Sequence, residues 1–94
     1  MIQYSFSRVE LLKDRTTNNV VGLITGMSAN DSVTNMSSYI DTSYSLPTPV
    51  ASLTDDEIRN ICLQIAQDSG WYSILYNQIQ SLNNQPVSTS VTGI

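Results

Sequence analysis

The chain has 94 residues, of which 40% are hydrophobic, so it can form one small domain with a modest core. Only 13% of the residues are charged, whereas Ser, Thr, Asn and Gln supply 37 of the 94. Four scattered cations cannot neutralise a phosphate backbone, residues 1–7 lack a signal-peptide pattern, and no apolar run approaches the roughly 20 residues of a membrane span. We therefore expect a folded protein with a neutral polar surface that binds neither nucleic acid nor membranes.

The sequence lacks the residues of most catalytic and metal sites. It has no His, and its one Cys, Cys62, lies among aliphatic residues at helical spacing, which predicts a buried, inert thiol. The sequence therefore lacks the ligands of a typical zinc site and the residues of a nucleophilic triad. Glu10, Asp41 and Asp68 are the carboxylates that could serve an acid–base pair, but each stands alone in a polar or turn context. We predict a protein that is not an enzyme and has no metal or cofactor.

The first strand is predicted from the alternation of Ile2, Tyr4 and Phe6 with polar residues. The apolar positions then change phase and continue at Val9 and Leu11. One extra residue restores the register, so we predict a β-bulge near residues 7–8.

A turn over residues 13–19 leads to a second predicted strand, Val20–Met27. Gly22 and Gly26 share one face of this strand with Ile24. The favoured interpretation is that this face lies under a loop. The alternative is that it receives a neighbouring element, since glycine in a strand is typical of a place where another backbone comes close.

A polar loop, Ala29–Asn35, precedes the longest alternation in the chain, Met36–Leu46. Pro47 and Pro49 remove backbone donors and fix their own φ angles, so we expect this third strand to stop at Leu46. Residues 46–51 then form a stiff bridge, because residues before proline prefer extended conformations.

A complete set of helix-start signals follows. Thr54 and Glu57 have the spacing of a capping box, and Leu53 and Ile58 that of a hydrophobic staple. The acidic run 55–57 suits the positive end of the helix dipole. Its alternative role, cation binding, is disfavoured because consecutive helical carboxylates diverge. The helix is predicted over Thr54–Asp68, with Ile58, Ile61, Cys62, Ile65 and Ala66 facing the sheet.

A second helix is predicted beyond Gly70, from the spacing of Trp71, Ile74, Leu75, Ile79 and Leu82. One continuous helix kinked at Gly70 is the alternative. Tyr72 and Tyr76 lie four residues apart on an adjoining face. With Trp71 they form the largest aromatic concentration, which favours either core packing or a contact surface for another protein.

Residues 83–94 differ from the domain that we expect over 1–82. They carry no charged side chain and contain β-branched residues, including Val87 and Val91. A frayed chain end is one interpretation. The other is an extended arm that adds to a neighbouring protein as an edge strand, with Val87 and Val91 as contact residues.

Together these elements predict an α+β fold, in which a three-stranded antiparallel meander precedes two helices and an extended C-terminal arm. The aromatic strand Ile2–Phe6, the segment S-L-P-T-P (45–49) and the helix start L-T-D-D-E-I (53–58) resemble a family of small uncharacterised proteins of tailed bacteriophages. The resemblance covers the domain in outline and residues 45–58 in detail. It implies a phage gene product with a small sheet-plus-helix fold, and no catalytic residues.

The resemblance and the neutral surface together predict a bacteriophage virion structural protein, assembled in the host cytoplasm. We expect a capsid decoration (cement) protein, a homo-oligomer that bridges subunits of the major capsid protein through its aromatic helix and its arm. The alternatives are a tail or connector component that contacts other virion proteins, and a non-virion phage protein that binds a host factor.

Overall fold

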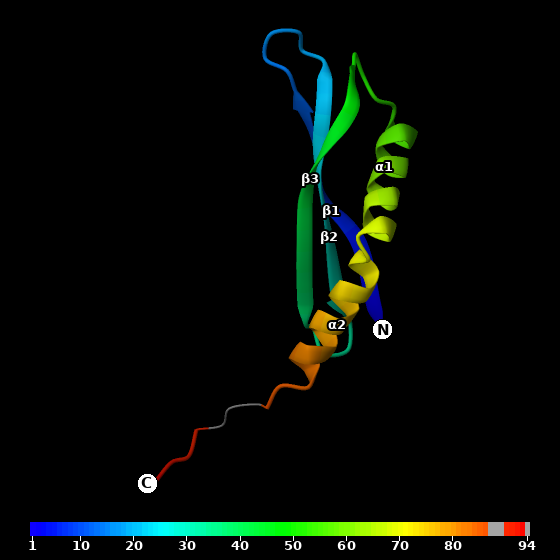
Figure 1. The fold of residues 1–94 in the computed structure, drawn as a ribbon. Helices are drawn as coiled ribbons and strands as arrows, with labels where there is room; N and C mark the ends of the chain where they lie inside the picture. The colour runs from blue at the N-terminus through cyan, green and yellow to red at the C-terminus, as the bar shows by residue number, and fades with distance from the viewer. Residues whose placement is uncertain (87–89, 94) are drawn as a thin grey trace.

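The computed structural model describes residues 1–86 and 90–93. Three strands, β1 (Ile2–Lys13), β2 (Val20–Asp31) and β3 (Ser37–Val50), form one antiparallel sheet in the order β1-β2-β3. Two helices, α1 (Asp55–Asp68) and α2 (Trp71–Asn83), follow and pack on one face of the sheet (Figure 1). The predicted α+β fold, a meander followed by two helices, is confirmed.

The β-bulge in β1 is present where the phase of the sequence changes. The register of β1 against β2 shifts between Phe6 and Arg8, which leaves Ser7 as an extra residue. Val9 consequently returns to the face that Phe6 occupies. Without this bulge, the two halves of β1 would present their apolar side chains to opposite sides of the sheet.

Strand β2 is longer than the sequence indicated, and the loop predicted from Ala29 is correspondingly shorter. The strand continues to Asp31, which lies opposite Ile2 of β1. Asn30 is held in the strand by its neighbour in β3, because its amide donates to the Ser37 hydroxyl over 2.8 Å. A central strand has ladder hydrogen bonds on both sides, and these outweigh the low strand propensity of its polar residues.

The prolines do not end β3, contrary to the expectation that the strand stops at Leu46. The strand continues through Pro47 and Pro49 to Val50. Residues 46–49 lie opposite a single residue of β2, and pairing resumes at Val50. Proline is tolerated here because β3 is an edge strand, on which a missing N–H need not break the sheet.

The two glycines of β2 mark places where β3 comes close, which was the alternative to a covering loop. A Cβ on Gly22 would overlap the carbonyl oxygen of Tyr44 and lie 3.3 Å from its carbonyl carbon. A Cβ on Gly26 would overlap the Tyr39 hydroxyl and lie 2.7 Å from Cζ of that ring. The neighbour is thus backbone at Gly22 and an aromatic side chain at Gly26.

Helix α1 begins with the predicted capping box. The Thr54 hydroxyl accepts a hydrogen bond from the Glu57 N–H at 3.2 Å, and the Glu57 carboxylate accepts one from the Thr54 N–H at 3.0 Å. The hydrogen bond from the Thr54 N–H, followed by the Thr54 hydroxyl, holds the pKa of the Glu57 carboxyl below its usual value. The helix ends at Asp68, and Gly70, with φ of 66°, separates it from α2. The described part of the chain therefore has two separate helices here, as predicted.

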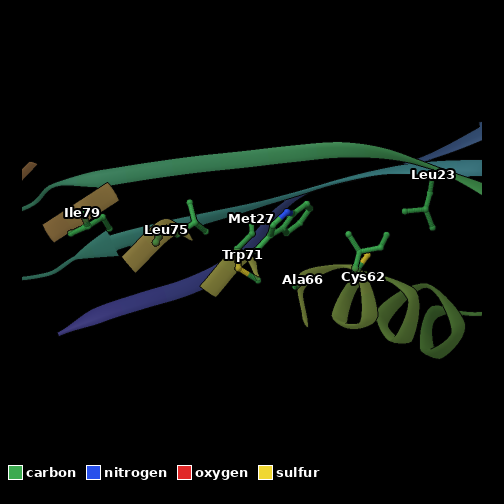
Figure 2. Close-up of a cluster of buried hydrophobic side chains, with 9 residues drawn as sticks. Leu23, Met27, Cys62, Ala66, Trp71, Leu75 and Ile79 are labelled. Atoms are coloured by element: carbon green, nitrogen blue, oxygen red, sulfur yellow. The ribbon is translucent and has the colours of Figure 1, made fainter. Parts of the chain in front are cut away.

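The core lies between the helices and β2. It comprises Leu23, Met27 and Ala29 of β2, Cys62, Ile65 and Ala66 of α1, and Trp71, Leu75 and Ile79 of α2 (Figure 2). The Cys62 side chain is buried, as predicted. Ile74, one of the apolar positions whose spacing predicted α2, is outside this core and 38% exposed. It lies about 100° around the helix from the mean direction of Trp71, Leu75 and Ile79, beyond the narrow stripe that contacts the sheet.

Candidate functional site

Helix α2 separates its aromatic residues into two environments. Trp71 points into the core together with Leu75 and is only 3% exposed (Figure 2). Its predicted role as a contact residue is therefore wrong, because a buried side chain offers no surface to a partner. Tyr72 and Tyr76 lie on the adjoining face of the helix, 37% and 47% exposed. Both are available at the surface, as a contact role requires.

A third tyrosine, from the first strand, completes this surface. Tyr4 of β1 meets Tyr72 edge to face, with ring centroids 5.2 Å apart and planes at 71°. Tyr4, Tyr72, Ser73, Tyr76 and Asn77 line an open groove of about 310 Å³, which we call the tyrosine groove. None of these side chains is charged. The groove combines large apolar faces with hydroxyl and amide groups, a composition that suits protein contacts.

Tyr4 was not predicted to belong to this surface. Its alternation with Ile2 and Phe6 correctly indicated the helix-covered face of the sheet. Its contact with Tyr72 depends on where α2 packs on the sheet, and nothing in the sequence between residues 4 and 72 indicates that position.

A cluster around Asp31 fixes the end of α2. The Asn83 amide donates to the Asp31 carboxylate at 3.1 Å, and the Val33 N–H donates to it at 2.9 Å. The Thr34 hydroxyl donates to the Asn83 side-chain oxygen at 2.7 Å. The pKa of Asp31 is held below its usual value chiefly by the hydrogen bond from the Val33 N–H. The Asn83 amide, the nearby terminal amine and the Thr34 N–H act in the same direction, and together they outweigh the effect of burial. The point at which the C-terminal segment leaves the domain is thereby tied to the β2–β3 turn.

The C-terminal segment itself is described only in part. Helix α2 includes Asn83, one residue beyond the expected domain boundary, so the segment begins at Asn84. Residues 90–93 form neither helix nor strand, and Val91 is 72% exposed. Val87 lies outside the described residues. The proposed addition of this segment to a partner's sheet stays a prediction.

The uncovered face of the sheet carries a charged cluster. Arg8 contacts both Glu10 and Asp41, with 3.1 Å to the latter, and Asp41 also accepts a hydrogen bond from the Tyr39 hydroxyl at 3.1 Å. The contact with Glu10 raises the pKa of Arg8 above its ordinary value. The pKa of Tyr39 is raised, mainly because its hydroxyl is partly buried and in addition because the Asp41 carboxylate lies beside it.

The three carboxylates considered for acid–base chemistry do not meet. Glu10 and Asp41 share Arg8 on the uncovered face. Asp68 lies at the end of α1, where it accepts a hydrogen bond from the Gln64 amide at 2.7 Å. It lines an open groove of about 280 Å³ with Tyr44, Asn60, Ile61, Gln64 and Ile65. No second carboxylate lines that groove.

Across residues 1–86 and 90–93, no group of three or more Cys, Asp or Glu side chains is placed to hold a metal ion. Within the same residues, no helix is long and apolar enough to cross a membrane. Comparisons with family models, curated proteins and solved structures give no match to this chain. The resemblance to tailed-phage proteins therefore stays a prediction, and the proposals below rest on the residues themselves.

Proposed function

We propose that the protein is a structural component of a bacteriophage particle, a decoration protein that binds the major capsid protein and has no catalytic activity or cofactor. The observation that carries this proposal is the tyrosine groove, a set of exposed aromatic side chains that the core does not need. Trp71, Leu75 and Ile79 already attach α2 to the sheet. Tyr72 and Tyr76 contribute nothing comparable to that core, which favours a contact role.

The chemistry of the groove favours a protein partner. Tyrosine buries a large area at a small cost in side-chain entropy, and its hydroxyl can find a new partner at an interface. An uncharged groove requires no desolvation of ions when it is covered. The charge-free segment after Asn83 offers further backbone and side-chain contacts. On a symmetric shell such weak contacts are repeated, and multivalency converts them into stable attachment.

The location is tested by quantitative mass spectrometry of purified particles from a phage that encodes this chain. A copy number in the hundreds is expected for a decoration protein. A dozen copies or fewer would assign the protein to the tail or connector, and absence from particles would indicate a non-virion protein.

The contact surface is tested by co-sedimentation with particles that lack the protein. Tyr72→Ala and Tyr76→Ala should each weaken binding by about tenfold or more, since exposed tyrosines at interfaces are frequent hot spots. Tyr39→Ala is the matched control, because Tyr39 is 47% exposed like Tyr76 but lies on the uncovered face of the sheet. Equal binding by all three variants would remove the tyrosine groove from the mechanism.

The C-terminal segment is tested separately. Truncation after Gln85 keeps Asn83 and its contacts with Asp31 and Thr34, so the domain should remain folded. Reduced occupancy on the shell is expected for this truncated chain. Unchanged occupancy would show that the segment plays no part in attachment.

A further inference from the structure

Strand β1 forms an exposed edge of the sheet. Its first half alternates between half-buried and exposed residues, whereas every residue from Ser7 to Lys13 is exposed. Val9, Leu11 and Leu12 are 44%, 37% and 36% exposed in this second half. An exposed edge that carries apolar side chains invites pairing with another strand.

The other edge of the sheet is less suited to pairing over its full length. Pro47 and Pro49 lie in β3, and each removes a backbone donor from that edge. Strand β1 contains no proline. Continuous pairing is therefore favoured along β1.

We propose that two copies of this chain pair antiparallel along β1, with the two-fold axis at Val9, to form a continuous six-stranded sheet. This inference goes beyond the proposed virion role and does not depend on it. The occupant of the β1 edge is a second copy because the second half of β1 is complementary to itself.

The register follows from the charges. Residues directly opposite each other in an antiparallel pair share a face, so Arg8 and Glu10, which lie on the uncovered face, can oppose each other. When Val9 faces Val9 of the second copy, Arg8 faces Glu10 of that copy, and the symmetry repeats this contact. Shifting the register by two residues in one direction places Arg8 against Arg8, and in the other direction Glu10 against Glu10. Only the register centred on Val9 pairs opposite charges at both positions.

The intrachain contacts of Arg8 are compatible with this arrangement. Its guanidinium has five N–H donors, and Glu10 and Asp41 of the same chain engage only some of them. The Arg8 side chain is 44% exposed and that of Glu10 is 54% exposed, so both can reach the second copy. The bulge at Ser7 limits the regular ladder to a few residues, which predicts a weak dimer with a dissociation constant on the order of micromolar.

Disulfide trapping tests the position of the two-fold axis. In a Cys62→Ala background, Val9→Cys should give a disulfide-linked dimer on mild oxidation, because opposed residues of antiparallel strands have Cα atoms about 4.5–5.5 Å apart. Ser43→Cys in the same background is the matched control, an exposed cysteine on the β3 edge. Cross-linking at Ser43→Cys without cross-linking at Val9→Cys would overturn the proposal.

Charge exchange tests the register by sedimentation velocity. Glu10→Arg alone and Arg8→Glu alone should each dimerise at least about tenfold more weakly, since both cross-strand pairs become repulsive, and an equimolar mixture should form a heterodimer. Lys13→Glu alters the net charge as much as Arg8→Glu does, but it should leave dimerisation unchanged. A mixture that stays monomeric, or a wild-type chain that is monomeric at all concentrations, would refute the pairing. Loss of the dimer on truncation after Gln85 would instead identify the C-terminal segment as the occupant, which also refutes it.

Discussion

Replacement of the two glycines of β2 should have very different effects on stability. Neither glycine has a positive φ, so alanine suits both backbones and only the surrounding space matters. At Gly22 the new methyl group would overlap the Tyr44 carbonyl oxygen, which is part of the β3 backbone. At Gly26 it would overlap the end of the Tyr39 side chain, which can rotate away.

The loss of stability at each glycine depends on which part of the structure must move to admit the new methyl group. Gly22→Ala forces two paired strands apart and should lower the free energy of unfolding by about 2–3 kcal/mol, as overpacking does elsewhere. Gly26→Ala displaces a tyrosine from an exposed hydrogen bond with Asp41 and should cost less than about 1 kcal/mol. Urea unfolding followed by circular dichroism measures both, with the m-value as a check that the unfolding transition is unchanged.

A double-mutant cycle with Tyr39→Ser isolates the cause at Gly26. Without the ring, Gly26→Ala should cost less than it does with Tyr39 present, because only the Asp41 Cβ, 3.0 Å from the new methyl group, remains close. Gly22→Ala should cost the same in both backgrounds. Equal costs for the two glycine variants, or no coupling between Gly26 and Tyr39, would refute this account of the sheet.

Four further predictions concern the core, the helix start and pH. In urea unfolding, Leu75→Ala should lower the free energy of unfolding by about 3 kcal/mol and Ile74→Ala by less than about 1 kcal/mol, because only Leu75 is buried. A reversed order would place Ile74 in the core. Thr25→Val should stabilise by about 1 kcal/mol, as judged by thermal unfolding, since the buried Thr25 hydroxyl has no hydrogen-bond partner among the described residues; a loss of stability would contradict this. Thr54→Ala should cost about 1 kcal/mol through loss of the N-cap, and an unchanged melting temperature would count against the cap. The lowered pKa of Asp31 stabilises the fold above the ordinary carboxyl pKa of 3.8, and this contribution is lost as the pH falls through the folded-state value. Unfolding measured from pH 6 to pH 2 should therefore be less pH-dependent for Asp31→Asn than for the wild type, and parallel curves would show that this carboxylate is not coupled to folding.

Features decided by neighbouring residues could be predicted from the sequence. The bulge at Ser7, the capping box of Thr54 and Glu57, and the break at Gly70 each depend on a few adjacent positions, because hydrogen bonds and backbone angles within one turn or one strand determine them. The meander and the two helices followed from hydrophobic periodicity. For Tyr72 and Tyr76 the sequence left core packing and surface contact open, and only the packing of α2 placed both at the surface.

The tertiary structure decided the features that depend on pairing between distant segments. Pairing on both sides kept polar Asn30 in β2, and an edge position allowed β3 to continue through Pro47 and Pro49. The direction in which α2 crosses the sheet buried Trp71 and brought Tyr4 to Tyr72. Local propensities amount to tenths of a kcal/mol per residue, whereas burial of an aromatic side chain contributes a few kcal/mol, so long-range packing prevails where the two disagree.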